Sequence, residues 1–262
     1  MDEKLLIQKP SNHEGIEEQL KYMPGVGRSI AWLILFTLLF YGAVFIFGGA
    51  YGFYLGMNDP QLALNVGEIE QLTLDAILSP FGMSATFYIQ SVLLIPFIIW
   101  ASNFSQQSWR ETLAFRPVAW SVLGFWLLVY VGYLVIQTLV ELVFPIEHNE
   151  FIKSLAGSKH FGLAVGMIVI APVIEELVFR GYLYKAWRHT RLGLWGTLIV
   201  TSLLFTAVHM AQYSGMILVY VFALSILLGL AREKSGSIWP PLVIHSMNNL
   251  IAVVTLVYLG IV

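Results

Sequence analysis

The segment that decides the fold is FGLAVGMIVIAPVIEELVFRGYLY, residues 161–184. A helix of roughly 20 apolar residues crosses the hydrocarbon core of a bilayer, and this segment is long enough to do so. It nevertheless carries Glu175, Glu176 and Arg180 in its second half. A charged side chain at membrane depth costs about 2.5–3.5 kcal/mol on insertion scales and is retained mainly where it has a function. The segment therefore predicts a membrane protein with a polar site inside the membrane.

The composition of the whole chain agrees with a membrane protein. Of the 262 residues, 58% are hydrophobic and only 11% are charged, whereas soluble domains carry about 25% charged residues. There is no cysteine, which excludes a disulfide framework, a thiolate metal site and a thiol nucleophile. The net charge is −2 and no basic run is present, so we expect no nucleic-acid partner.

Seven apolar stretches are long enough to be candidate spans. They are Ser29–Tyr54, Ser79–Ala101, Val118–Phe144, Phe161–Tyr184, Leu194–Ala211, Met216–Ala231 and Pro240–Val262. We therefore expect an all-α polytopic membrane protein, a bundle of about seven transmembrane helices. The polar residues 1–28 lack a short apolar core with a cleavage site, so they are interpreted as a cytosolic tail rather than a signal peptide.

The placement of lysine and arginine predicts the orientation. One side of the predicted membrane carries most of the cations, in the tail and in alternate loops: Lys4, Lys9, Lys21, Arg28, Arg110, Arg116, Lys185, Arg188, Arg191, Arg232 and Lys234. The opposite side carries only Lys153 and Lys159. With seven spans, the N-terminus is predicted to be cytosolic and the C-terminus to lie outside.

Helical geometry predicts different partners for the two adjacent glutamates. Residues four apart share a helix face, so Glu176 can pair with Arg180. Glu175 points about 100° away and is left as a free carboxylate for proton transfer. The alternative is that all three form a buried ion network that fixes helix packing. Pro172, one turn earlier, fits a local kink that frees a backbone carbonyl; the alternative is that it serves helix packing.

Two later spans carry histidines. His209 ends the sequence Phe-Thr-Ala-Val-His, residues 205–209, and His245 lies four residues before Asn249. Because His245 and Asn249 share a helix face, both could donate to one oxygen atom, as an oxyanion hole requires. The alternative is helix-packing hydrogen bonds. A regular bundle would separate the two histidines in depth by roughly 15 Å, unless the short fifth and sixth spans form a hairpin that stops early.

These three motifs, in this order, resemble the CPBP family, also called Abi or CAAX protease self-immunity proteins. Its eukaryotic relatives are the type II CAAX prenyl endopeptidases. The motifs are Glu175-Glu176-x-x-x-Arg180, Phe205-x-x-x-His209 and His245-x-x-x-Asn249, and the resemblance covers about residues 161–250. The family's studied members are usually drawn with eight spans. The resemblance divides the chain into the tail 1–28, N-terminal helices 29–144 and a catalytic core 145–262.

The resemblance implies a site for each motif. Glu175 would activate a water for attack on a peptide carbonyl, and His209 would position or deprotonate that water. His245 and Asn249 would stabilise the oxyanion, while Glu176 and Arg180 would support the site. The resemblance thus implies an intramembrane endopeptidase with no cofactor and no required metal, acting on a membrane-associated peptide or protein in the bilayer.

Substrate and mechanism stay open at this stage. In a prenylating organism the substrate would be a CAAX tail; in a bacterium, whose plasma membrane would then hold the protein, peptide maturation, bacteriocin self-immunity or an envelope protein is expected. One alternative is a zinc-dependent protease with Glu175, His209 and His245 as ligands. Another is a non-enzymatic partner or a proton-coupled carrier, because membrane Glu/His/Arg chains also relay protons.

Overall fold

The computed structural model describes residues 25–59, 61–103, 107–146 and 149–261. Helices joined by turns and short loops make up these ranges, and no strand occurs within them. The predicted all-α fold is therefore confirmed. The predicted tail lies outside the described residues apart from residues 25–28.

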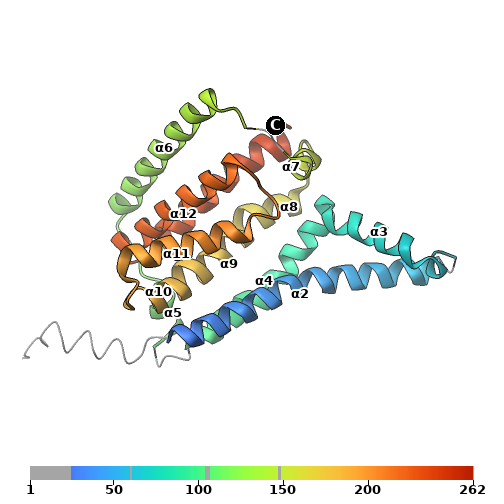
Figure 1. Cartoon of the computed structure of the whole chain (residues 1–262), viewed down its shortest axis with the longest axis horizontal. Helices are drawn as coiled ribbons and strands as arrows, with labels where there is room; N and C mark the ends of the chain where they lie inside the picture. Colours follow the sequence, from blue (N-terminus) through green and yellow to red (C-terminus); the bar gives the residue numbers. More distant parts are fainter. Residues whose placement is uncertain (1–24, 60, 104–106, 147–148, 262) are drawn as a thin grey trace, which may run out of the picture.

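Six helices of the described chain are long and apolar enough to cross a membrane (Figure 1). They are α2 (Val26–Asn58), α4 (Pro80–Ser102), α6 (Trp120–Val143), the run Phe161–Trp187, α12 (Met216–Ser235) and the run Trp239–Tyr258. Each of them matches a predicted span, so the protein is a multi-pass integral membrane protein. α2 begins before and ends after its predicted span, and the last helix stops at Tyr258 rather than Val262.

The fifth predicted span, Leu194–Ala211, is shorter than expected. Its helix, α11, runs from Gly193 to Val208 and has 16 residues, which corresponds to about 24 Å at 1.5 Å per residue. This length is less than the roughly 30 Å of hydrocarbon. The helix packs against α12, so the two form the short hairpin that the positions of the histidines require.

Three further helices are short or polar. They are α3 (Val66–Leu78), α5 (Trp109–Thr112) and α7 (Glu150–Leu155). α3 begins with Asn65, whose side chain accepts a hydrogen bond from the Glu68 backbone, as an N-cap asparagine does. It packs against both α2 and α4. In Figure 1, α2, α3 and α4 form one group, which packs against the central run Phe161–Trp187 mainly through α4 and also through α2.

The run Phe161–Trp187 is the central helix of the bundle. Half of its most apolar window is buried, against 11% for Trp120–Val143. The main hydrophobic cluster surrounds it, with Leu94 and Ile98 of α4, Phe36 of α2 and Phe205 of α11. The charged residues of the deciding segment therefore lie inside protein rather than against lipid. That position lowers the cost of retaining them.

The outer surface of the helices is apolar. Leu128 of α6 is 70% exposed and Phe45 of α2 is 78% exposed. Large apolar side chains on this scale are typical of a surface that faces lipid, because water-soluble monomers rarely expose extended apolar patches.

Candidate active site

The central helix departs from α-helical geometry on both sides of the glutamates. It consists of α8 (Phe161–Val165), a π-helical segment Gly166–Ile170, α9 (Ala171–Glu176), a second π-helical segment Leu177–Leu183 and α10 (Tyr184–Trp187). π-Helical turns are rare and concentrate at functional sites, because they change which side chains share a face. The two glutamates thus lie between two such segments.

The first π-helical segment leaves one carbonyl without a partner inside its own helix. The Ala171 amide donates to the Gly166 carbonyl, five residues back. The next amide in that register belongs to Pro172, which has no N–H. The carbonyl of Met167 is therefore free, and the side-chain amide of Asn249 donates to it at 2.8 Å. The freed carbonyl agrees with the first of the two interpretations of Pro172.

The predicted ion pair between Glu176 and Arg180 is present and fully buried. Nη1 of Arg180 lies 2.9 Å from Oε1 of Glu176, with the two side chains 3% and 0% exposed. Nη2 of Arg180 donates to the backbone carbonyl and the hydroxyl of Ser225, at 3.0 and 2.7 Å. The Ser225 hydroxyl in turn donates to Ser202 at 2.9 Å. The guanidinium is thereby fixed from two helices, α9 and α12.

His245 shares the oxygen that Arg180 uses. Its Nδ1 lies 2.9 Å from Oε1 of Glu176, and its side chain is 5% exposed. A carboxylate oxygen accepts hydrogen bonds, so Nδ1 carries the proton in this contact. The opposite nitrogen, Nε2, then lies 3.7 Å from Oε2 of Glu175.

His209 is oriented in the same way by the backbone. Its Nδ1 lies 2.7 Å from the carbonyl oxygen of Phe205, which can only accept, so Nδ1 carries the proton here as well. Its Nε2 lies 3.9 Å from Oε2 of Glu175. Both imidazoles therefore approach the same oxygen of Glu175, as the hairpin alternative requires, because the short α11 ends at Val208.

Glu175 is the carboxylate on which both rings converge. Its side chain is 20% exposed, whereas that of Glu176 is fully buried. Oε2 of Glu175 is buried and accepts no hydrogen bond from the described residues. When the two imidazole rings are neutral, the Nε2 atom of each has a lone pair that points toward this oxygen. Three acceptors that face one another suit a group that donates protons, such as a water molecule or an ammonium.

Aromatic rings enclose the charged groups. Cζ of Arg180 lies 4.5 Å from the ring centroid of Phe205, a cation–π distance. The same ring lies 4.7 Å from His209 and 5.7 Å from His245. Tyr213 stacks on the other side of His209, at 6.0 Å and 8°. Phe205 therefore contacts all three motifs and fixes their spacing.

The loop after His209 is anchored to a different part of the chain. The side-chain amide of Asn149, which caps α7, donates to the Gln212 carbonyl at 2.8 Å. Gly215, with φ of 57°, then starts α12. This anchor limits how far the His209 ring can move away from Glu175.

The structure brings five of the six predicted site residues into one connected set of contacts: Glu175, Glu176, Arg180, His209 and His245. Asn249 lies on the next turn from His245 but is bonded to the Met167 carbonyl. Ser225 and Ser202 were missed. A single serine in an apolar helix is a weak signal, and only the spatial position of Arg180 gives it a role.

Metal binding is not suggested by the spacing of the side chains. In the described part of the chain, no group of three or more His, Cys, Asp or Glu residues is arranged to hold a metal ion. The three groups of the zinc alternative, Glu175, His209 and His245, are those that converge at 3.7 and 3.9 Å.

Comparison with known families agrees with the motifs. The profile of the type II CAAX prenyl endopeptidase Rce1-like family matches residues 157–251. The resemblance is confirmed. The match runs from before α8 into the last turn of α13 (Trp239–Ala252) and includes all six predicted site residues. The helices α2, α4 and α6 lie outside the matched residues. The family is one of membrane proteases.

Similar curated proteins are bacterial and uncharacterised. An uncharacterised 24.3 kDa protein of Escherichia coli is 32% identical over 30% of this chain and 37% of its own length. The UPF0177 protein YbdI of Lactococcus lactis is 32% identical over 38% of this chain and 56% of its own. The uncharacterised protein YpbD of Bacillus subtilis is 39% identical over 36% and 45%. The chain thus spans about a third to just over half of these relatives. No solved structure gave a significant match.

Proposed function

We propose that the protein is an intramembrane endopeptidase in which Glu175 activates water for hydrolysis of a peptide bond. The observation that carries the proposal is the convergence of Oε2 of Glu175 with Nε2 of His209 and Nε2 of His245, at 3.9 and 3.7 Å. These distances are longer than direct hydrogen bonds and within reach of one bridging water. The Rce1-like match supports the same reaction class.

The chemistry requires one proton transfer in each direction. Glu175 takes a proton from water as the oxygen attacks the carbonyl carbon, and a tetrahedral oxyanion forms. The protonated Glu175 then gives that proton to the amide nitrogen as the carbon–nitrogen bond breaks. The products are a carboxylic acid and an amine, and no covalent bond to the enzyme forms. His209, held by the Phe205 carbonyl, positions the water through Nε2.

His245 and Asn249 are assigned to the oxyanion. Nδ1 of His245 is bonded to Glu176, so Nε2 donates to an oxyanion only when the ring carries both protons. The nearby Glu176 carboxylate stabilises that charged ring, as the buried acid does in histidine triads. Asn249 has a second amide hydrogen besides the one on Met167, and this hydrogen is the one available for the oxyanion.

The substrate we infer is a membrane-associated peptide or protein cut near the cytosolic leaflet. We assign one end of the bundle to the cytosolic side because cations gather there. One pocket at this end is lined by Arg116, Lys185, Arg188 and Arg232. An excess of cations is typical of the cytosolic side. In a prenylating organism a CAAX tail fits this description. In a bacterium, a plasma-membrane location with peptide maturation or self-immunity fits it.

Comparison of protein termini tests the reaction class. Membranes of cells that make the wild-type protein are compared with membranes that carry Glu175→Gln, and new peptide termini are identified by mass spectrometry. The matched control is Glu150→Gln, because Glu150 lies on α7 and its side chain is 90% exposed. We expect new termini with the wild type and with the control, and none with Glu175→Gln. New termini in all three would contradict the proposal.

In the zinc-dependent alternative, the same three side chains would bind a zinc ion, and the zinc would activate the water. Two imidazoles and a carboxylate are a known catalytic ligand set, and Glu175, His209 and His245 converge here, although no group of three such residues in the described chain is arranged to hold a metal ion. Metal analysis of the purified, active protein separates the two. Stoichiometric zinc that is required for cleavage would replace our proposal.

The carrier alternative predicts instead that Glu175→Gln abolishes transport without altering protein termini.

A further inference from the structure

A polar pocket lies at the end of the bundle, apart from the glutamates. It has a volume of about 320 Å³, at the lower end of the roughly 300–1,000 Å³ typical of small-ligand sites. Three separate segments contribute to it: residues 107–116, which include α5, residues 184–189, which include α10, and the end of α12. None of its lining residues takes part in the proposed hydrolysis.

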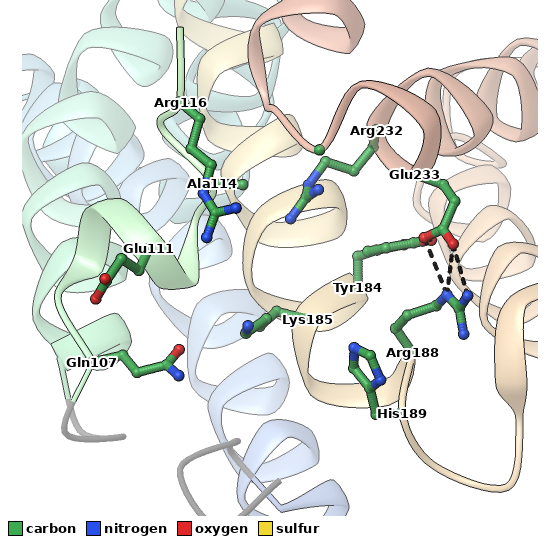
Figure 2. A pocket seen from close by; sticks show the side chains of 11 residues that line it. Gln107, Glu111, Ala114, Arg116, Tyr184, Lys185, Arg188, His189, Arg232 and Glu233 are labelled. Atoms are coloured by element: carbon green, nitrogen blue, oxygen red, sulfur yellow. Dashed lines mark hydrogen bonds and ion pairs between the residues drawn. The ribbon is translucent and has the colours of Figure 1, made fainter. Parts of the chain in front are cut away.

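The pocket has an excess of positive charge. Arg116, Lys185, Arg188 and Arg232 face two carboxylates, Glu111 and Glu233. Figure 2 shows the guanidinium groups of Arg116 and Arg232 and the amine of Lys185 pointing into the space between the segments. Four cations against two anions leave a net charge of +2 when His189 is neutral.

One of the two carboxylates is already neutralised. Oε1 of Glu233 lies 2.7 Å from Nη2 of Arg188, and the hydroxyl of Tyr184 donates to the same carboxylate. The remaining cations, Arg116 and Lys185, have no ion-pair partner among the described residues. Their charge is therefore available to a ligand.

Arg232 is the most constrained of the cations. Arg232 is 8% exposed, and its Nε donates to the backbone carbonyl of Arg180 at 3.0 Å. Its Cζ lies 5.5 Å from the ring centroid of Tyr184. The two Nη groups make no hydrogen bond within the described chain, so they remain available to a ligand. They point into the pocket in Figure 2.

The turn that presents Arg116 is also fixed in place. Ala114 has φ of 58°, a left-handed conformation that is unfavourable for alanine by about 1–2 kcal/mol. The Ile238 amide donates to its carbonyl at 3.0 Å, and the hydroxyl of Ser237 donates to the Arg116 carbonyl at 2.6 Å. Contacts with the α12–α13 connection therefore offset the strain and hold Arg116 at the pocket.

The lowered pKa of His189 agrees with an excess of positive charge around it. Partial desolvation, and then the charges of Arg188 and Lys185, lower the pKa of His189. The ring is therefore neutral at pH 7, and the excess of two positive charges stands.

We propose that this pocket binds a phosphate group. A doubly negative, tetrahedral phosphate matches an excess of two positive charges, and guanidinium groups bind its oxygens in pairs. The group can belong to a phospholipid whose headgroup is a phosphate monoester, because the pocket lies where the spans Phe161–Trp187 and Met216–Ser235 end. It can equally be a soluble phosphate. The proposal does not depend on the peptidase reaction.

Thermal unfolding of the purified full chain tests the proposal in two arms. In detergent micelles, inorganic phosphate is titrated against sodium chloride of equal ionic strength. In lipid nanodiscs, phosphatidylcholine is compared with phosphatidylcholine that contains phosphatidic acid. A ligand that binds only the folded state raises the unfolding midpoint as its concentration rises. Stabilisation by phosphate in micelles indicates a soluble ligand, and stabilisation only in phosphatidic acid indicates a headgroup. Equal stabilisation by chloride, or none in either arm, overturns the proposal.

Variants locate the binding to the pocket. Lys185→Gln and Arg116→Gln should each weaken apparent phosphate affinity about tenfold or more, since a charge-assisted hydrogen bond is lost. Lys185→Arg should retain binding, which separates loss of the ligand contact from misfolding. Arg191→Gln is the matched control, because Arg191 is an exposed cation outside the pocket. An equal loss of affinity in Arg191→Gln would indicate diffuse surface charge and contradict the assignment.

Discussion

Oε1 of Glu176 lies 2.9 Å from both Nη1 of Arg180 and Nδ1 of His245. One buried oxygen thus links the ion pair of the central helix to the histidine of the last helix. This link turns Nε2 of His245 toward Glu175, at 3.7 Å. Glu176 is accordingly a positioning residue in our account, and the neighbouring Glu175 is the catalytic one.

The buried pair should contribute far more to stability than an exposed pair. We expect Arg180→Met to lower the free energy of unfolding by about 3–5 kcal/mol, because it leaves Glu176 buried without a partner. Lys153→Met removes the exposed pair with Glu150, whose side chains are 52% and 90% exposed, and should cost less than about 1 kcal/mol. Unfolding in detergent measures both, and similar losses would refute the assignment of a structural ion pair.

His209 should be protonated on Nδ1 in its neutral form. The Phe205 carbonyl, 2.7 Å away, can only accept a hydrogen bond, so it selects this tautomer. ¹⁵N NMR of histidine-labelled protein distinguishes the two ring nitrogens by their chemical shifts. Val208→Ala serves as a control that leaves the hydrogen bond intact. Observation of the Nε2–H tautomer would mean that Nε2 does not offer a lone pair to water.

Pro172 and Asn249 should be energetically coupled through the Met167 carbonyl. Pro172→Ala supplies an amide that can bond this carbonyl, so the hydrogen bond from Asn249 becomes partly redundant. We expect Asn249→Ala to cost about 1 kcal/mol less in the Pro172→Ala background than in the wild type. A double-mutant cycle of unfolding free energies measures this coupling. Strict additivity would show that the proline does not control the carbonyl.

Gly166 should not tolerate a side chain. A Cβ at this position would lie 2.4 Å from Cδ2 of Phe87, so Gly166→Ala should lower stability by about 1–3 kcal/mol through overpacking. A Cβ added to Gly132 of α6 would have nothing within 4 Å, and Gly132→Ala should raise stability by about 0.5–1 kcal/mol. Thermal unfolding compares the pair, and Gly166→Ala combined with Phe87→Leu should recover part of the loss.

The sequence predicts much of the fold, because membrane spans depend on local composition. Six of the seven expected spans are helices of sufficient length. The Glu176–Arg180 pair was also predictable, since residues four apart face each other whenever the segment is helical. That Pro172 leaves a carbonyl free could be predicted from its missing N–H, whereas the identity of this carbonyl, Met167, depends on the π-helical register.

Other features of the site depend on tertiary structure. The depth of His209 could not be predicted, because the length of α11 and its packing against α12 determine it. The contact of Asn249 with Met167 requires two helices far apart in sequence. Ser225 shows no local pattern, and the phosphate pocket assembles cations from separate loops whose meeting depends on the complete bundle.

The central claim is that Glu175 is the base of peptide hydrolysis, and its most direct test is a cleavage rate. Purified protein in vesicles is assayed with a quenched fluorescent peptide that ends in a farnesylated CAAX sequence, alongside Glu175→Gln and Glu150→Gln. We expect Glu175→Gln to lower the rate by about 10²–10⁴-fold, the range for loss of a general base, with Glu150→Gln unchanged. A Glu175→Gln rate equal to that of the wild type would contradict the account.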